Sequence, residues 1–448
     1  MKKQEFQEWI RGRIIFLDGA TGSNLQRRGM PAGVCPELWV MEHPDVMKQL
    51  QQEYIQAGSD IIYAPTFSGN RIKMKEYGLA DRLEEINAGL VELSRQAADG
   101  KALVAGDITM TGAQLDPVGD LTFRELLEVY KEQIGIISAA GADLLVVETM
   151  MSLQETRAAV LAAKEVCPNL AVMATLSFTE SGNTLYGVSA ESAVVTLQAL
   201  GVDAVGLNCS AGPDKMTEIV RRMKAVAEIP LIAKPNAGMP RMGADGQTEY
   251  DMDGETFADC MAAVAEAGAQ IAGGCCGTSP EYIEKLRKKV GGMIPAAPAK
   301  RGPVYLADER QVYPFAEGQI LELGEGIDFT KNPELMEEYR EEIFDTAQDI
   351  AFDLQEEEAD ALLFTAAGLE EEAEILQSAV MEVTGTVRMP VVIAAADPAA
   401  VARALEGYCG IAGVMPLCDD EGTMEAMKEV IRRYGAQMVT LDKEIRCC

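Results

Sequence analysis

Three cysteines have the flanking residues and the spacing expected of metal ligands. Cys209 stands in GLNCSAGP, and Cys275 and Cys276 stand side by side in GGCCGTSP. Neighbouring cysteines close a disulfide only with strained geometry, so the vicinal pair is better suited to sharing a metal ion. The flanking glycines let the backbone bring both sulfur atoms to one ion. Three thiolates suit Zn²⁺, and three protein ligands leave a fourth position for water or substrate, as in catalytic zinc sites.

Other metal ligands and general bases are scarce. The one histidine, His43 in MEHPD, is far from the cysteine segments, and Asn236 in KPNAG offers only a weak amide oxygen. A Ser-His-Asp or Cys-His arrangement would therefore need His43, which disfavours nucleophilic hydrolysis. A zinc-bound thiolate needs no general base, because the metal keeps the thiol deprotonated near neutral pH. The residues favour alkyl transfer to sulfur, although the cysteines could also be buried thiols that pack as small hydrophobic residues.

The segments that must position these cysteines have a regular order. Eight short apolar runs recur in residues 1–300, each followed by a longer stretch with helical periodicity. This pattern predicts the α/β class and a (β/α)8 TIM barrel, with an open doubly wound sheet as the alternative. The barrel is favoured because DGATGSN, after the first run, lacks the G-x-G-x-x-G spacing. The predicted strands cover residues 14–20, 60–67, 102–108, 143–149, 171–178, 204–210, 230–238 and 270–277.

Polar side chains stand at the carboxyl ends of these strands, where the chemistry of such barrels lies. Besides the cysteines they are Asp18, Thr66, Asp107, Glu148, Ser177 and Asn236. We expect them to converge on one mouth of the barrel. Carboxylates at two strand ends, Asp18 and Glu148, are suited to bind a cationic group. The alternatives are that Asp18 is a turn residue and that Glu148 pairs with a Lys or Arg at the mouth.

Composition limits the partners and the location. A net charge of −32 on 448 residues argues against nucleic acid and against an anionic membrane surface as partners. The start of the chain has Glu5, Glu8 and Arg11 where a signal peptide needs an apolar core. No apolar run approaches the ~20 residues that span a bilayer. Ten cysteines are too sparse for a disulfide scaffold, so we expect a cytoplasmic protein.

The last third of the chain has a different charge density. Residues 301–448 hold 32 acidic and 11 basic residues, which gives −21 and leaves −11 for residues 1–300. We therefore expect two domains, 1–300 and 301–448, joined at the linker APAKRGP.

The motifs together resemble one known family, the homocysteine S-methyltransferases, over about residues 10–290. The segments that carry the resemblance are, in order, FLDGATGSNLQRRG, EHPDVMKQLQQEYIQAGSDIIYAPTF, GLNCS, KPNAG and GGCCGTSP. The resemblance implies a zinc-dependent enzyme that transfers a methyl group to the thiol of homocysteine and forms methionine. It implies Cys209, Cys275 and Cys276 as zinc ligands, and Asp18 and Glu148 as carboxylates that hold the ammonium group of the substrate.

The resemblance also suggests roles for Asn236, as a weak fourth ligand that the thiol displaces, and for Thr66, as a further substrate contact. It leaves the methyl donor open. A cobalamin-binding D-x-H-x-x-G is not among these residues, since no histidine is available for it. A methylated corrinoid protein in trans is the favoured donor, and S-methylmethionine, S-adenosylmethionine and betaine are the alternatives.

Residues 301–448 resemble the first half of the folate-binding barrel that follows the homocysteine module in cobalamin-dependent methionine synthase. The strands LLFTAAG and VIAAAD are mostly apolar where a pterin ring needs polar partners, so folate binding is not expected. The remaining length is too short for a second full barrel, which needs roughly 200 residues or more. We expect an α/β half-barrel that covers its edges by docking on the first barrel or by forming a homo-oligomer.

Two other kinds of function stay open from sequence. The barrel could be a non-catalytic scaffold that holds zinc, with the acidic half-barrel as a docking module. The acceptor could also be another thiol, such as selenocysteine or a coenzyme thiol.

Overall fold

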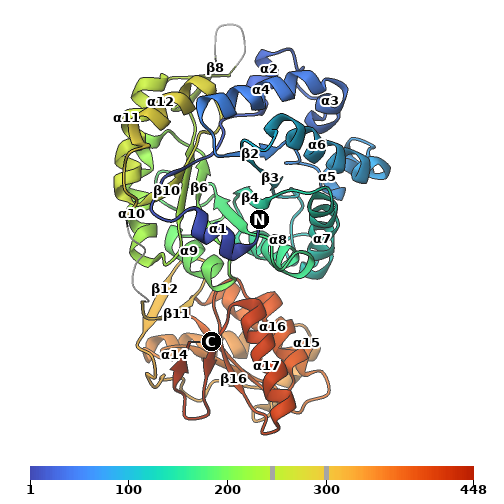
Figure 1. Cartoon of the computed structure of the whole chain (residues 1–448). Helices are drawn as coiled ribbons and strands as arrows, with labels where there is room; N and C mark the ends of the chain where they lie inside the picture. The colour runs from blue at the N-terminus through green and yellow to red at the C-terminus, as the bar shows by residue number, and fades with distance from the viewer. Residues whose placement is uncertain (243–247, 297–301, 448) are drawn as a thin grey trace. The chain divides into compact units, whose positions relative to one another are not determined.

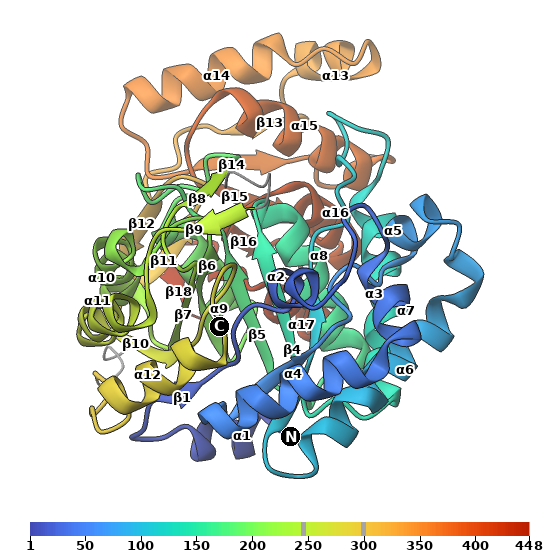
Figure 2. The same ribbon diagram turned by 90° about the horizontal axis from the view of Figure 1, so that it is seen from above.

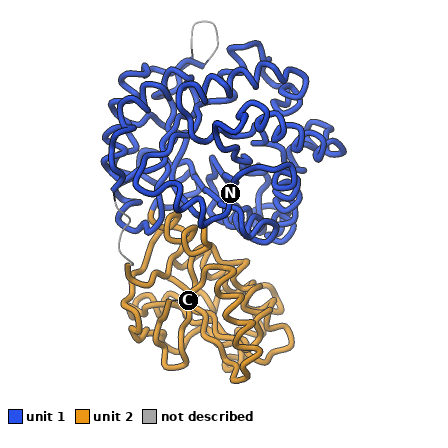
Figure 3. Tube along the Cα trace, viewed as in Figure 1, with its two compact units in different colours: residues 1–190, 202–300 blue, residues 191–201, 301–448 orange. Residues whose placement is uncertain are grey.

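The computed structural model describes residues 1–242, 248–296 and 302–447 (Figure 1). The chain divides into two compact units, residues 1–190 with 202–300 and residues 191–201 with 301–448 (Figure 3). Most of the predicted linker, residues 297–301, lies outside the described part of the chain. The domain boundary after residue 300 therefore stays a prediction.

The first unit is built on a barrel of eight parallel strands. Their order in the sheet is β1-β10-β7-β6-β5-β4-β3-β2, and a parallel bridge between Leu17 and Ile61 joins the first strand to the last. All eight predicted strands are present, so the predicted (β/α)8 barrel is confirmed. The strands are β1 (Ile15–Phe16), β2 (Ile61–Ala64), β3 (Leu103–Ile108), β4 (Leu144–Met150), β5 (Val172–Leu176), β6 (Ala204–Cys209), β7 (Leu231–Pro235) and β10 (Ala269–Ala272).

The strands are linked by helices that surround them (Figure 2). Several begin where the sequence supplies a capping side chain: Thr122 and Glu125 form a capping box, and Ser152 and Asp253 accept backbone hydrogen bonds at two other starts. The helices that follow the strands include α4 (Pro44–Ala57), α6 (Leu83–Ala98), α7 (Phe123–Ala139), α8 (Leu153–Val166), α10 (Thr217–Val226), α11 (Gly254–Ala267) and α12 (Pro280–Val290). The helix between β5 and β6, α9 (Ala190–Ala199), belongs almost wholly to the second unit. Shorter ones are α1 (Lys3–Trp9), α2 (Gly22–Arg27), α3 (Pro36–Glu42) and α5 (Arg71–Glu76).

The barrel interior is apolar at its amino-terminal end and closed there by α1. Phe6 and Ile10 are buried in one cluster with side chains from all the barrel strands. Lys3 donates its backbone N–H to Asn169, which precedes β5, and Gln270 of β10 donates to the carbonyl of Ile10. Because this end is closed by packing, the opposite end is the one left for chemistry.

The loop at the carboxyl end of β7 contains a β-hairpin. After β7 the chain forms an antiparallel hairpin of β8 (Pro240–Met242) and β9 (Thr248–Tyr250), in which Pro240 pairs with Tyr250. The hairpin is fixed at its base because Met252 donates its N–H to the carbonyl of Ala237.

The second unit contains a six-stranded sheet in the order β13-β14-β15-β16-β17-β18. The first five strands are parallel and follow one another in sequence, which is the arrangement of half a barrel, and β18 is antiparallel. Its strands are β13 (Ile327–Asp328), β14 (Leu362–Thr365), β15 (Val391–Ala395), β16 (Gly413–Pro416), β17 (Gln437–Val439) and β18 (Ile445–Arg446), after a hairpin of β11 (Val304–Ala307) and β12 (Val312–Phe315). Its helices are α13 (Pro333–Arg340), α14 (Asp345–Glu356), α15 (Glu372–Thr386), α16 (Pro398–Gly407) and α17 (Glu421–Tyr434).

The second unit thus has the predicted α/β composition, and its likeness to the first half of a pterin-binding barrel stays a prediction. No helix in the described residues has the length and apolar character needed to cross a membrane.

The close approach of β6 to β7 gives a testable prediction for the fold. A Cβ added at Gly206 would lie 2.0 Å from the backbone oxygen of Ile232, so Gly206→Ala forces the two strands apart. We expect a loss of about 1–3 kcal/mol in the free energy of unfolding, measured by urea denaturation. In α7, a Cβ at Gly135 meets only Val166 at 3.7 Å, so Gly135→Ala is the control and should be neutral or stabilising. Equal stabilities of the two variants would contradict the strand contact.

Candidate metal centre

The three cysteines predicted to bind metal come together at the mouth of the barrel. The Sγ atoms of Cys209, Cys275 and Cys276 all lie within 4.8 Å of one another, and in the described residues they are the one such group of three Cys, His or carboxylate side chains. Zn–S bonds of about 2.3 Å place tetrahedral sulfur ligands about 3.8 Å apart. The observed cluster therefore fits one zinc ion with three thiolate ligands.

The backbone directs these thiols by an unusual turn. Cys209 and the residue after it, Ser210, have φ values of +60° and +58°, in the left-handed region that non-glycine residues rarely adopt. Such strain persists where the surrounding structure holds it, and it is concentrated at functional sites. Cys275 donates its N–H to the carbonyl of Pro235, and Ala237 donates to the carbonyl of Cys276, so the loops after β7 and β10 are tied together.

The thiols share protons. The pKa of Cys276 is lowered to about 3 by hydrogen bonds from Cys209 and Cys275. The pKa of Cys209 is raised, first by its hydrogen bond to Cys275 and then by its bond to Cys276 and by burial. One thiolate forms easily in this cluster, and further thiolates are opposed by the charge of the first.

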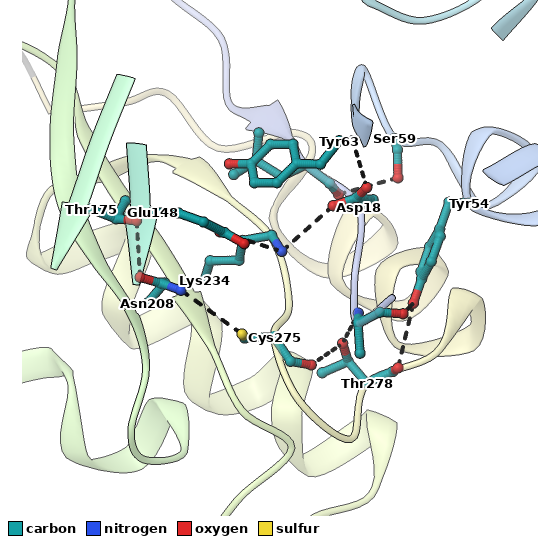
Figure 4. Close-up of polar contacts among 12 residues, drawn as sticks. Asp18, Tyr54, Ser59, Tyr63, Glu148, Thr175, Asn208, Lys234, Cys275 and Thr278 are labelled. Carbon is teal, nitrogen blue, oxygen red and sulfur yellow. Dashed lines mark hydrogen bonds and ion pairs between the residues drawn. The ribbon is translucent and has the colours of Figure 1, made fainter. Parts of the chain in front are cut away.

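Two donors from outside the cluster reach its sulfur atoms. Asn208 points its Nδ2 at the Sγ of Cys275 at 3.9 Å (Figure 4). The buried Asn208 amide is itself oriented by the Thr175 hydroxyl, which donates to its oxygen, and by the Thr149 hydroxyl, which accepts from its nitrogen. The hydroxyl of Tyr250, in β9, hydrogen-bonds the Sγ of Cys276.

A cluster of buried charges lies beside the sulfur cluster. Lys234, next to the last residue of β7, has its Nζ 3.6 Å from Asp18 Oδ1 and 3.9 Å from Glu148 Oε2, and it lies 4.7 Å from the centre of the Tyr63 ring (Figure 4). Asp107 adds a third buried carboxyl, which hydrogen-bonds Glu148. Three carboxyl groups therefore share one lysine.

Burial sets the protonation of this cluster. It raises the pKa of Asp18 to about 6 and that of Glu148 to about 7, although Lys234 opposes both shifts. The pKa of Asp107 is raised well above its usual range by burial and by the charge of Glu148. Burial lowers the pKa of Lys234, but the carboxylates of Glu148 and Asp18 outweigh it, and the net direction is upward. Lys234 is thus a fixed positive charge, and the carboxyls are the groups that titrate.

Asp18 and Glu148, predicted to face a shared cavity, are brought together by the structure. Each keeps one buried oxygen without a hydrogen-bond partner, Asp18 Oδ1 and Glu148 Oε2, in the described part of the chain. The alternative that Glu148 pairs with a lysine at the mouth also describes what is seen, since Lys234 lies next to it. The other oxygen of Asp18 accepts the backbone N–H of Tyr63, which fixes the carboxyl in place.

The other two predicted substrate contacts, Asn236 and Thr66, differ in whether their side chains already have hydrogen-bond partners. Asn236 keeps its Oδ1 buried and, among the described residues, without a hydrogen-bond partner, as a displaceable ligand would. The Thr66 hydroxyl is used within the barrel, because it donates to the carbonyl of Asp107 and accepts the N–H of the same residue. Its role toward the substrate stays a prediction.

Sequence reasoning left Lys234, Asn208 and Tyr250 without roles. A signal existed for Lys234, since a lone cation interrupts the apolar run LIAKP. Asn208 precedes a predicted ligand in GLNCS, but its orientation depends on residues of two other strands.

Comparison with known proteins places the chain in a family. The model of a family described as homocysteine S-methyltransferase matches residues 15–290. Among curated proteins, the methionine synthase of Mycobacterium leprae is 30% identical over 373 residues, which cover 77% of this chain and 30% of that protein. The methionine synthase of Mycobacterium tuberculosis is 31% identical over 300 residues, which cover 63% and 25%. The chain thus matches a third or less of the length of these relatives.

Solved structures with the same fold include the homocysteine methyltransferase MmuM from Escherichia coli. Its oxidised form is 22% identical with a TM-score of 0.52, and the match covers 61% of this chain and 95% of that one. Its metallated form is 21% identical with a TM-score of 0.53, and the match covers 63% and 98%. These likenesses show the shared barrel fold. The family model itself covers well over half of this chain, with all eight barrel strands and the three clustered cysteines. The chain belongs to the homocysteine S-methyltransferase family.

Proposed function

We propose that this chain is a zinc-dependent methyltransferase that converts homocysteine to methionine. The observation that carries the proposal is the cluster of three thiol sulfurs within 4.8 Å, placed beside buried carboxyl groups at the mouth of a barrel of this family. Cys209, Cys275 and Cys276 would hold the zinc. When bound, zinc keeps a fourth thiol deprotonated near neutral pH at its open position.

The protein side chains have separate tasks in this mechanism. Asp18 and Glu148 bind the ammonium group of homocysteine through the two oxygens that also face Lys234, Asp18 Oδ1 and Glu148 Oε2, which directs the substrate thiol toward the sulfur cluster. Lys234 keeps these carboxyls from repelling each other before substrate arrives. Asn236, whose buried Oδ1 has no hydrogen-bond partner among the described residues, would be the weak ligand that the substrate thiol replaces. The thiolate then forms the new S–CH₃ bond while the bond from carbon to the donor breaks, so no general base is needed.

We propose a methylated corrinoid protein as the donor. The support is that the curated relatives are named methionine synthases. S-methylmethionine, S-adenosylmethionine and betaine are the competing donors.

We further propose that residues 301–448 form a domain with a docking or covering role and without bound folate. The match to the first relative covers 77% of 448 residues, about 345, so it must continue past residue 300. The carboxyl ends of β14 and β15 carry the buried Ala366 and Ala395 where a pterin would need polar partners.

The most direct test of function supplies each donor in turn. Zinc-loaded full-length protein and homocysteine are incubated with a methylated corrinoid protein, S-methylmethionine, S-adenosylmethionine or betaine, and methionine is measured. We expect the corrinoid protein to give the fastest turnover. If no donor yields methionine, the proposed activity is wrong. If a small donor gives a faster rate than the corrinoid protein, the proposed donor is wrong.

The zinc ligands are tested by replacing each with alanine. We expect Cys209→Ala, Cys275→Ala and Cys276→Ala to lose both bound zinc and activity, because two thiolates hold Zn²⁺ much less tightly than three. Cys260→Ala is the matched control, since this half-buried cysteine lies in α11 outside the cluster, and it should keep about one zinc per chain. Zinc is measured by atomic emission. A fully active Cys276→Ala protein would refute the ligand assignment.

Glu148→Gln separates substrate binding from metal binding. The change removes a charged contact to the substrate ammonium, so homocysteine affinity, measured by calorimetry, should fall by about 1.5–3 kcal/mol. Zinc content should be unchanged because Glu148 is not a ligand. Glu180→Gln, at an exposed position in the loop after β5, is the control for loss of one negative charge. If homocysteine affinity were unchanged in Glu148→Gln, this carboxylate would not be part of the site.

The raised pKa values of Asp18 and Glu148, about 6 and about 7, predict a pH dependence. A carboxyl is neutral below its pKa and then attracts an ammonium group less. The ratio of the affinity for homocysteine to the affinity for 4-mercaptobutanoate, which lacks the amino group, should therefore fall as pH falls from about 8 to about 6. Thiol deprotonation affects both compounds and cancels in the ratio. A ratio that stays constant with pH would show that these carboxyls do not bind the ammonium.

A further inference from the structure

A zinc site of this kind has a selectivity problem. When a substrate thiolate joins Cys209, Cys275 and Cys276, four sulfur atoms of similar chemistry lie around one ion. The methyl donor could react with any of them, because each thiolate is a nucleophile. Methylation of a cysteine would turn a charged ligand into a neutral thioether and weaken the metal site.

Hydrogen bonds to the protein thiolates offer a solution. A donor that contacts a thiolate takes up part of its lone-pair density and lowers its reactivity, in the way that outer contacts tune metal ligands. Asn208 Nδ2 lies 3.9 Å from the Sγ of Cys275, and the Tyr250 hydroxyl hydrogen-bonds that of Cys276. Both donors are held in place by the fold, whereas the substrate thiolate enters from outside.

The position of Tyr250 is built into the fold. Gly277, at φ +83°, leaves room for its ring, since a Cβ there would lie 2.4 Å from Tyr250 Cγ and Cδ2. Pairing with Pro240 holds Tyr250 in the hairpin, and its ring packs on Gly277, the residue after Cys276. The Tyr282 hydroxyl donates to the carbonyl of Met252, two residues further on, and so anchors the same segment.

We propose that Tyr250 is a specificity-determining residue, which directs the methyl group to the substrate by hydrogen-bonding the Cys276 thiolate. The inference rests on the proposed function, because it assumes a zinc-bound thiolate as the nucleophile. In the reaction that Tyr250 suppresses, the lone pair of Cys276 sulfur forms an S–CH₃ bond. The bond from carbon to the donor breaks, and its electron pair leaves with the donor.

The test uses methyl iodide as the methyl source and zinc-loaded full-length protein without homocysteine. Iodide is then the leaving group, and tandem mass spectrometry reports S-methylation separately at Cys209, Cys275 and Cys276. Tyr250→Phe keeps the ring and removes the hydroxyl. We expect methylation of Cys276 to become roughly ten- to hundredfold faster than in the unchanged protein, as the loss of one hydrogen bond to a charged group implies, with little change at Cys275.

Tyr282→Phe is the matched control, because it loosens the same segment without removing a donor to sulfur. Its methylation pattern should equal that of the unchanged protein. An unaltered rate at Cys276 in Tyr250→Phe would overturn the proposal, and so would loss of zinc from that variant, since Tyr250 would then serve metal retention. Zinc content and methionine formation are also measured in the unchanged protein, as a separate test of the proposed function. If the unchanged protein binds zinc and forms methionine, but Tyr250→Phe leaves the methylation rate of Cys276 unaltered, the role of Tyr250 is refuted and the proposed function stands.

Discussion

Repulsion among three thiolates is the constraint on which the site depends. Sulfur atoms within 4.8 Å of one another cannot all carry a negative charge unless protons or a cation lie between them. Without a metal the cysteines share protons, which is why the pKa of Cys276 falls while that of Cys209 rises. A divalent cation removes this conflict. The left-handed backbone at Cys209 and the tied loops after β7 and β10 keep the sulfurs close in spite of the repulsion.

The same balance of charge governs the buried carboxyl groups beside the sulfurs. Asp18, Asp107 and Glu148 are buried around Lys234, and one lysine cannot neutralise three carboxylates. Burial therefore keeps part of this set protonated at neutral pH, as the raised pKa values indicate. A ligand that brings its own ammonium group relieves the deficit of positive charge. This balance of charge supports the proposal that the site binds an amino acid in preference to a simple thiol.

Sequence predicted the architecture because its signals are local. Buried parallel strands appear as apolar runs, and all eight were found, although the runs extended past the strands: the run 14–20 contains β1 only at Ile15–Phe16. The excess includes the loop where Asp18 lies, because the last paired residue of this run is Leu17. The grouping of Cys209 with the vicinal pair also followed, since carboxyl ends of parallel strands meet at one mouth. What sequence missed depends on side-chain direction and loop path. Tyr250 reaches Cys276 only because the hairpin after β7 folds back, and no periodicity reports that path.

The central claim is that substrate sulfur completes a zinc site made of three protein thiolates. X-ray absorption at the zinc K-edge tests it most directly, on zinc-loaded protein with and without homocysteine. The account predicts three sulfur neighbours and one oxygen or nitrogen neighbour in the free protein, and four sulfur neighbours after homocysteine is added. A coordination shell that homocysteine leaves unchanged would contradict it.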